Sequence, residues 1–309
     1  MFLVAGAQKC ATSWLYLCLA DHPELRLPDR KREVEYLGGA IHRERGDAWY
    51  LELVGRAGHA ATSAQPRRPL LGDVSVEYLY DPASPREVAR LLPDVQVVVS
   101  LRDPVGRAVS AWTWYRRKGT LPGSRTLAAD LEAGADWLER TDAGRHAEVW
   151  PTPGEPEELV ARGCYDVQLE RWITEAVPPD RLLVLDYAAL ARSPEGPLSA
   201  IWRFLGVGDH RPEKLDERPK RNTYRPWLAR LERLAPRNRP WAALLDRIQR
   251  LLPGRVEPTA ALPESLRARL EAAFAPSRDR TASLLGRLPR DRRPDRPSFC
   301  PPPDPPADG

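Results

Sequence analysis

Short hydrophobic runs alternate with amphipathic stretches along much of the chain. Val95–Leu101 is almost continuously β-branched, a pattern typical of a strand that is covered on both faces in a parallel sheet. Phe2–Ala5, Leu70–Val76 and Arg181–Asp186 are short apolar runs of the same kind. We therefore predict strands at these four positions.

The amphipathic stretches predict helices. Ser84–Leu92 begins with a serine cap and has Pro85 at its first helical position, which is a common helix start. The other predicted helices are Ser13–Ala20, Pro104–Arg117, Tyr165–Ala176 and Pro197–Leu205, with two more near Pro226–Leu234 and Pro263–Phe274. Strands that alternate with helices predict an α/β fold, a three-layer sandwich around a mostly parallel central sheet.

Two regions do not follow this alternation. The stretch 118–162 is polar and interrupted by Pro and Gly, although it contains Trp137 and Trp150. Because connections of this length are usually functional or disordered, we expect it to form an acceptor lid. The Pro-rich stretch 289–309 cannot build a core, so we expect it to be disordered. The rest, 1–288, is expected to form one domain.

Charge, cysteine content and hydropathy exclude several classes of binding partner. The 309 residues carry a net charge of only +4, which argues against a dedicated nucleic-acid binder but permits a local pocket for a small anion. The four cysteines lack the close pairing of a zinc site and are too few for a disulfide scaffold. No apolar run approaches the roughly 20 residues that a membrane helix needs. We expect a cytoplasmic protein with free thiols, no metal and no membrane contact.

The segment after the first predicted strand has the makings of an anion site. It supplies a turn, a cation and two hydroxyls directly before a helix, in the order Gly6, Ala7, Gln8, Lys9, Cys10, Ala11, Thr12 and Ser13. Backbone N–H groups at a helix start carry partial positive charge and bind phosphates. Lys9 follows Gly6 by only three residues, and the chain lacks the Gly-Lys-[Ser/Thr] triplet of nucleoside-triphosphate loops. Alone, the segment is also compatible with an ordinary strand–helix connection.

A second segment points to another phosphate. Arg102 lies at the carboxyl end of the β-branched strand, where α/β folds place their ligands. Ser110 follows about two helical turns later. A guanidinium offers a planar fork to a phosphate, and a serine offers a neutral donor.

Together the two segments resemble the PAPS-dependent sulfotransferase family, most closely its heparan-sulfate-type and bacterial small-molecule branch (PAPS is 3′-phosphoadenosine 5′-phosphosulfate). In that family the Lys-bearing loop holds the 5′-phosphosulfate, and the segment equivalent to Arg102–Ser110 holds the 3′-phosphate. The resemblance implies the P-loop-like sulfotransferase fold, PAPS as sulfuryl donor and no metal. It covers most of residues 1–225 through the pieces Gly6–Ser13, Lys31–Leu37, Gly72–Leu79, Arg102–Ser110, Gly163–Trp172, Leu182–Leu190 and Phe204–Val207.

Three positions depart from the family pattern. Cys10 stands where the family usually has Gly or Ser, and Val74 stands where the heparan-sulfate branch has Lys. Tyr187 is followed by Ala188, although Tyr-Glu usually ends this strand. The departures concern the details of donor contact rather than the class.

Sulfuryl transfer needs a base for the acceptor and a group that stabilises the leaving phosphate. We expect Lys9 on the leaving-group side, because a cation there offsets the charge that develops on the bridging oxygen. The family resemblance assigns the base to Glu33. Glu35 replaces a family histidine and is expected on the acceptor side of an extended segment. The alternative is that both acids are solvated partners of Lys31 and Arg32. The five histidines are other possible bases, but their contexts favour none of them.

The resemblance also implies further binding residues. Tyr187 is expected near the adenosine and the basic loop Lys220, Arg221 and Asn222 over the 3′-phosphate; core packing and a solvated turn are the alternatives. Trp112 and Tyr115 share a helix face that borders the acceptor cleft in this family. Those two residues, with Trp137 and Trp150 of the expected lid, are acceptor-binding candidates, and core packing is again the alternative.

The sequence therefore predicts a sulfotransferase that transfers a sulfuryl group from PAPS to a hydroxyl or amine of a small-molecule or carbohydrate acceptor, as in natural product biosynthesis. One alternative is a kinase-like phosphotransferase, which would need Mg²⁺ ligands and a triphosphate loop. The other is a non-catalytic module that binds PAP, the desulfated nucleotide. Retention of Lys9, Glu33, Arg102 and Ser110 argues against that second alternative.

Overall fold

The computed structural model describes residues 1–28, 34–38, 43–59, 69–146, 150–152, 154–215, 262–295 and 297–300. The chain divides into two compact units, and one domain over 1–288 stays a prediction. We call Met1–Pro104, Cys164–Asp216 and Phe274–Gly309 the sheet unit. We call Val105–Gly163 and Glu217–Ala273 the helical unit.

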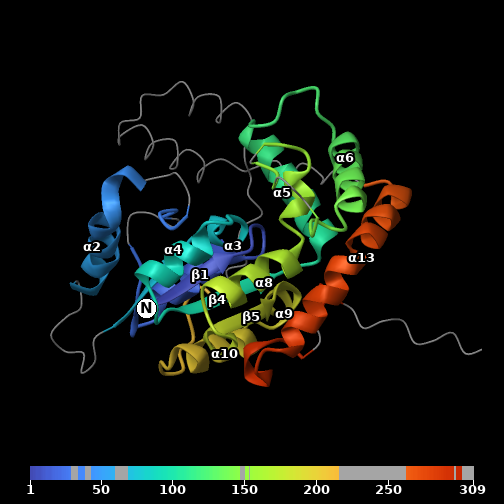
Figure 1. Cartoon of the computed structure of the whole chain (residues 1–309). Coiled ribbons are helices and arrows are strands. Elements are labelled where there is room, and N and C mark those ends of the chain that lie inside the picture. The colour runs from blue at the N-terminus through green and yellow to red at the C-terminus, as the bar shows by residue number, and fades with distance from the viewer. Residues whose placement is uncertain are drawn as a thin grey trace, which may run out of the picture. The chain divides into compact units, whose positions relative to one another are not determined.

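A five-stranded parallel sheet is the centre of the sheet unit (Figure 1). Its strands lie in the order β2-β3-β1-β4-β5, and their bounds are β1 Phe2–Gly6, β2 Leu25–Arg26, β3 Leu70–Val74, β4 Gln96–Leu101 and β5 Leu182–Asp186. The four predicted strands are confirmed, and β2 is an addition. The chain moves from β1 to one side of the sheet and later to the other, so the carboxyl ends of β1 and β4 flank a topological switch point, where α/β sheets bind ligands.

Helices cover both faces of the sheet. Leu3, Val97 and Leu182 face a core formed with α3, α4 and α8, whereas Phe2 and Val98 face a core formed with α1 and α10. This alternation follows from the two-residue period of a strand and confirms the predicted three-layer α/β fold. The helices of the sheet unit are α1 Thr12–Asp21, α2 Gly46–His59, α3 Glu77–Tyr80, α4 Ser84–Leu91, α8 Tyr165–Glu175, α9 Tyr187–Arg192 and α10 Glu195–Leu205, with the 3₁₀ turns η1 Arg43–Arg45, η2 Pro179–Arg181 and η3 Arg290–Arg292.

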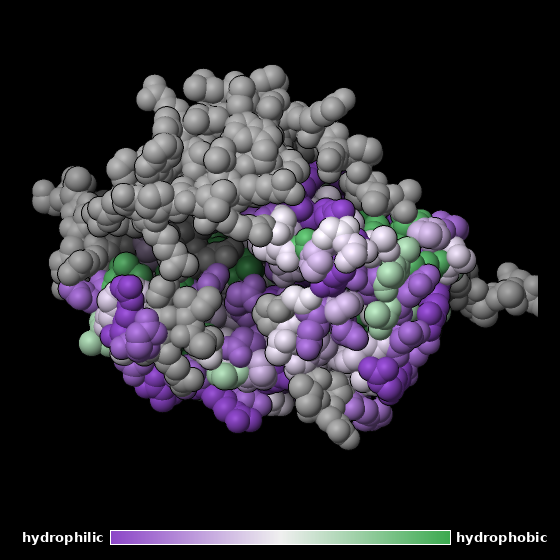
Figure 2. Space-filling model, turned by 90° about the horizontal axis from the view of Figure 1, so that it is seen from above, coloured by the Kyte–Doolittle hydropathy of each residue, from purple (hydrophilic) through white to green (hydrophobic). Residues whose placement is uncertain are grey.

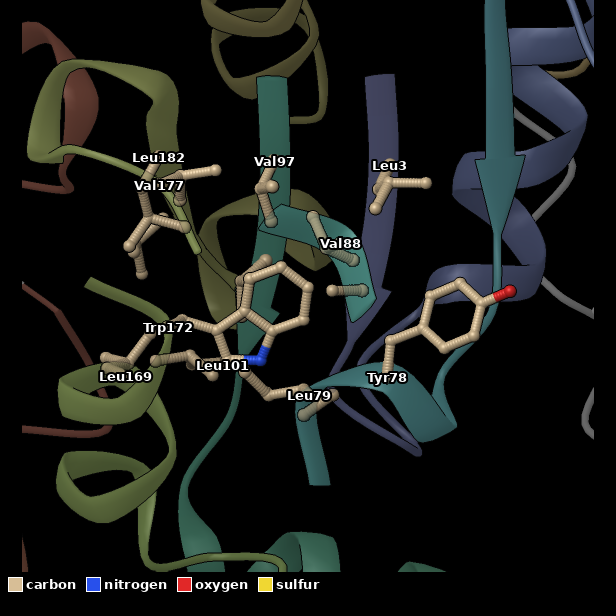
Figure 3. Close-up of a cluster of buried hydrophobic side chains, with 14 of the residues drawn as sticks. Leu3, Tyr78, Leu79, Val88, Val97, Leu101, Leu169, Trp172, Val177 and Leu182 are labelled. Atoms are coloured by element: carbon tan, nitrogen blue, oxygen red, sulfur yellow. The ribbon is translucent and has the colours of Figure 1, made fainter. Parts of the chain in front are cut away.

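Trp172 of α8 fills the middle of the first core. It is fully buried and lies among Leu79, Leu101 and Leu169, as Figure 3 shows. Truncating a buried Trp to Ala typically costs about 3–5 kcal/mol. This side chain therefore fixes α8 against the strands whose ends carry the candidate site.

The helical unit contains α5 Pro104–Lys118, α6 Leu127–Arg140 and α7 Glu158–Ala161, and α13 Glu264–Gly286 begins in it and continues into the sheet unit. Helices α6 and α7 lie in the stretch that we expected to be an irregular connection. The Thr126 side chain caps α6 by accepting a hydrogen bond from Ala129 N–H, and Leu131 and Leu138 are buried. The described part of the expected lid therefore contains folded helices with buried leucines.

The prediction of disorder from residue 289 is wrong for the described part of that stretch. Phe299 is 1% exposed and packs in the core cluster that includes Leu284, Leu285 and Leu288. Four other predictions fall outside the described residues: Glu33, the basic loop Lys220, Arg221 and Asn222, the helix near 226–234 and the final residues 301–309.

On the face seen in Figure 2, the described residues are hydrophilic ones mixed with residues of intermediate hydropathy and some hydrophobic ones. Leu51 is the one large hydrophobic residue with substantial exposure among the described residues. All four cysteines are buried free thiols. Within the described ranges, none of the helices combines the length and the apolar character needed to cross a membrane.

Candidate active site

The loop from Gly6 to Ser13 leaves the carboxyl end of β1 and enters α1. Its start is tied to the neighbouring strand, because Ala7 N–H donates to the Ser100 carbonyl of β4 at 2.9 Å. A Cβ on Gly6 would lie 2.9 Å from the Leu79 Cβ, so only glycine lets the loop approach α3 this closely. The loop is therefore held by β4 on one side and by α3 on another.

The first turn of α1 presents N–H groups at this loop. Ala11, at the N-cap, has a left-handed φ of 66° and provides no side-chain cap, and its carbonyl accepts the Trp14 and Leu15 N–H groups. Thr12 is 6% exposed, and Ser13 is exposed. Because the first N–H groups of a helix have no intrahelical acceptor, this end of α1 suits an oxyanion.

Cys10 has a structural role in the loop. Its side chain is fully buried in the first core, and its N–H donates to the Ala7 carbonyl at 3.2 Å. The Cys10 side chain, which is larger than that of the Gly or Ser in the family pattern, therefore occupies space in the core and not in the anion site. The departure at this position leaves the exposed side of the loop unchanged.

Arg102 and Tyr187, both predicted to bind the donor, lie together. Leu101 at the end of β4 pairs with Asp186 at the end of β5, so the next residues of both strands leave the sheet side by side. The Arg102 guanidinium lies over the Tyr187 ring, 4.6 Å from its centroid. Tyr165 Oη donates to the Arg102 carbonyl at 2.9 Å. Among the described residues no carboxylate pairs with this guanidinium, which leaves it available for an anion.

A buried hydrogen-bond network is centred on Asp73 at the end of β3, the strand next to β1, and it was not predicted from the sequence. Asp73 on β3 is fully buried and accepts from Tyr78 Oη at 2.8 Å, Ser75 Oγ at 3.0 Å and Tyr50 Oη at 3.2 Å. The two polar residues within the apolar run Leu70–Val76 were the available signal. Polar side chains in a buried strand need partners, and here three hydroxyls provide them.

Two of these hydroxyls hold the segment that follows Glu33. Ser75 Oγ accepts the Val34 N–H at 2.9 Å and the Glu35 N–H at 3.1 Å. Tyr78 Oη accepts the Tyr36 N–H at 3.1 Å. Since each hydroxyl accepts from the backbone, its proton points to Asp73, and the carboxylate orients all of these bonds. Residues 34–36 are thereby fixed to β3 and α3.

Burial dominates the electrostatics of this network. It raises the pKa of Asp73 to about 6, against the opposing effect of hydrogen bonds from Tyr78, Ser75 and Tyr50. Burial also raises the pKa values of Tyr50 and Tyr78 well above their usual range. The tyrosines therefore remain protonated donors at neutral pH.

The backbone at Glu35 differs from our expectation. Its φ of 50° is left-handed, so the segment is not extended at this residue. The Glu35 side chain is partly exposed. Glu33 itself lies outside the described residues, directly before the anchored Val34.

The helical unit carries the other candidates. Ser110 is partly exposed on α5. Trp112 is 8% exposed and donates from Nε1 to Asp130 at 2.7 Å, and Tyr115 Oη donates to Glu158 at 2.9 Å. Both polar atoms are thus used inside this unit, which favours a packing role.

The aromatic residues of the expected lid pack on each other. The Trp137 and Trp150 rings meet edge to face with centroids 5.8 Å apart, and Trp137 is 5% exposed. Acceptor binding by these two residues, and by Trp112 and Tyr115, stays a prediction.

Comparison with known proteins identifies a family. The family model described as "Sulfotransferase domain" matches residues 1–225. Human bifunctional heparan sulfate N-deacetylase/N-sulfotransferase 3 is 29% identical over 217 residues, which cover 68% of this chain and 22% of that protein. Mouse bifunctional heparan sulfate N-deacetylase/N-sulfotransferase 4 is 28% identical over 217 residues, with the same coverage of 68% and 22%. The chain thus spans about a fifth of the length of these curated relatives.

A solved structure shares the fold. The crystal structure of a sulfotransferase from Alicyclobacillus acidocaldarius has a TM-score of 0.55 and 22% identity, and the match covers 92% of this chain and 94% of that one. The family match spans the loop, the Asp73 network, Arg102 and Tyr187. By this match and this fold, the chain belongs to the sulfotransferase domain family.

Proposed function

We propose that the chain transfers a sulfuryl group from PAPS to a hydroxyl or amine of a small-molecule or carbohydrate acceptor. The observation that supports this most is the pairing of two cationic segments at adjacent strand ends. The loop that bears Lys9 follows β1, Arg102 follows β4, and the Ala7–Ser100 hydrogen bond joins the two segments. PAPS carries a 5′-phosphosulfate and a separate 3′-phosphate, so two neighbouring anion sites fit it.

The residues present suit both ends of this donor. Lys9, Thr12 and the N–H groups at the start of α1 would hold the 5′-phosphosulfate. Arg102 would bind the 3′-phosphate, and Tyr187, stacked beneath its guanidinium, would lie beside the adenosine. The roles of Gln8, Ser13 and Ser110, and of the loop Lys220, Arg221 and Asn222, rest on the family resemblance.

PAPS supplies the activated sulfuryl group when it is bound. Glu33 would accept the proton that the acceptor hydroxyl or amine loses as its bond to sulfur forms. Lys9 would stabilise the phosphate oxygen that retains the electron pair of the breaking S–O bond. The products are the sulfated acceptor and PAP.

The Asp73 network supports the assignment of Glu33. Hydrogen bonds from Val34, Glu35 and Tyr36 to Ser75 and Tyr78 fix the segment directly after it. A general base needs a defined position relative to the proton that it accepts. The network would supply that position from a rigid strand and helix.

Acceptor chemistry has two candidates. The relatives are named as heparan sulfate N-sulfotransferases, which makes a glucosamine-type amine one candidate. A small hydroxylated metabolite is the other, since the charge of +4 does not demand a polyanionic glycan. Transfer of label from [³⁵S]PAPS to N-desulfated heparan and to a panel of phenols and glycosides separates the two.

Glu33→Gln tests the role of the base. We expect nearly unchanged PAP affinity and a turnover number lower by roughly 10²–10⁴-fold, the usual contribution of a general base. Full turnover in this variant would refute the role of Glu33. Stabilisation of the wild type by ATP with Mg²⁺ and not by PAP would refute the sulfotransferase in favour of the kinase. Binding of PAP without transfer to either acceptor class would instead support the binding module.

A further inference from the structure

The C-terminal segment 297–300 returns to the carboxyl end of the sheet, beside the two residues proposed to bind the donor nucleotide. Phe299 and Cys300 are buried, with 1% and 7% exposure. Cys300 Sγ donates to the Arg278 carbonyl at 3.3 Å, which ties the segment to α13. A stretch with the composition of a disordered tail is therefore docked in the sheet unit.

Ser298 makes one connection to the site. Its Oγ donates to Asp186 Oδ1 at 2.6 Å and its N–H donates to Asp186 Oδ2 at 3.2 Å. Asp186 ends β5, is 3% exposed and caps α9 by accepting the Ala188 N–H at 3.0 Å. Ser298 thus donates two of the three hydrogen bonds that this buried carboxylate accepts from described residues. Tyr187 follows Asp186 directly, so its position depends on this carboxylate.

Phe299 makes a second connection to the site, which leads through Tyr165 to the end of β4. Its ring meets the Tyr165 ring edge to face, with centroids 6.1 Å apart and an interplanar angle of 80°. Tyr165 Oη donates to the Arg102 carbonyl at 2.9 Å. The Phe299 contact therefore fixes the tyrosine that holds Arg102 at the end of β4.

The two connections meet at one place, since the Arg102 guanidinium lies over the Tyr187 ring. We propose that Ser298 and Phe299 are positioning residues for the nucleotide end of the donor site, through Asp186–Tyr187 and Tyr165–Arg102. This inference rests on the proposed function, because it assumes that Arg102 binds the 3′-phosphate. The segment adds no charge to the site and acts by fixing the cation and the ring.

The test compares the affinities of PAP and 5′-AMP, which differ by the 3′-phosphate, by isothermal titration calorimetry on the full chain. Ser298→Ala removes the Oγ hydrogen bond to Asp186 and keeps the N–H one. We expect PAP to bind about 3–10-fold more weakly in this variant, because only part of the contribution of a hydrogen bond to a charged group reaches the nucleotide through Tyr187. The affinity for 5′-AMP should change less, so the PAP to 5′-AMP ratio falls. Ser298→Thr, which retains the hydroxyl, should restore the ratio. Ser283→Ala, the same change at an exposed position of α13, should not alter it.

Phe299→Leu gives an independent measurement. It keeps an apolar side chain in the core but removes the aromatic edge against Tyr165, and Phe274→Leu is the matched control at another fully buried site. A lower PAP to 5′-AMP ratio in Phe299→Leu and not in Phe274→Leu supports the positioning role. If wild type prefers PAP and both Ser298→Ala and Phe299→Leu keep that preference, the positioning role is wrong. If wild type itself does not prefer PAP, the proposed function fails before this inference is reached.

Discussion

Ser75→Ala removes one hydroxyl of the buried Asp73 network. Ser75 Oγ accepts the N–H groups of Val34 and Glu35 and donates to Asp73. Alanine fits the same space, because the change deletes one oxygen from a fully buried side chain. The substitution therefore tests these three hydrogen bonds with little change in packing.

The structure sets the size of the effect. Val34 is fully buried, and its N–H loses the Ser75 acceptor while it keeps a hydrogen bond to Asp73. The loss of one such hydrogen bond costs about 0.5–1.5 kcal/mol. The lost hydrogen bond to the buried Asp73 carboxylate contributes about 1.5–3 kcal/mol. Water can replace the acceptor for the partly exposed Glu35. Allowing for relaxation, we expect the free energy of unfolding to fall by about 2–4 kcal/mol.

Urea unfolding at pH 7 measures this difference, with Ser193→Ala as the control at an exposed serine. Because residues 34–36 also lose their anchor, the turnover number should fall more than PAP affinity does. A loss of less than about 0.5 kcal/mol, the range of ordinary surface substitutions, would refute the claim that Ser75 anchors this segment.

Two further predictions concern the same region. Burial raises the pKa of Asp73 in the folded state to about 6. Between about pH 4 and pH 6 the folded state therefore keeps a proton on Asp73 that the unfolded state has released. As the pH rises through that window, the contribution of Asp73 to the free energy of unfolding falls by about 3 kcal/mol. Urea unfolding of wild type and Asp73→Asn at pH 4.5 and pH 7 checks this, since the stability difference between them should shift with pH, and a constant difference would contradict it. Gly6→Ala should lower the free energy of unfolding by about 1–3 kcal/mol through overpacking against Leu79, and it should weaken PAP binding. Gly196→Ala is the control, because the space around a Cβ at that position is open. Urea unfolding and titration calorimetry should show neither effect in this control.

The sequence was informative where one local signal decides the structure. Val95–Leu101 predicted β4 because a β-branched run suits a strand buried on both faces. Strand β2, Leu25–Arg26, has two residues and is too short to show the alternation of apolar and polar residues that predicts a strand. Helix α6 did carry one, since Leu127, Leu131 and Leu138 repeat at helical spacing, but the surrounding Pro and Gly residues led us to expect an irregular connection.

The candidate site divides in the same way. The loop and Arg102 could be predicted because each depends on a contiguous segment at a strand end. The Asp73 network could not, since it needs hydroxyls from Tyr50, Ser75 and Tyr78, and their proximity is decided by tertiary structure. The position of Phe299 was missed for a related reason: the composition of a Pro-rich stretch does not show that one aromatic residue packs on Tyr165.

The central claim is that this fold binds a nucleotide through two anion sites, with Arg102 at the 3′-phosphate. The most direct measurement is the ratio of PAP to 5′-AMP affinity in wild type, Arg102→Ala and Arg102→Lys. A charged hydrogen bond contributes about 1.5–3 kcal/mol, so wild type should prefer PAP by about 10–100-fold. The preference should almost vanish in Arg102→Ala and be intermediate in Arg102→Lys, which keeps the charge without the fork. Equal affinity of wild type for the two nucleotides, or an undiminished preference in Arg102→Ala, would contradict the account.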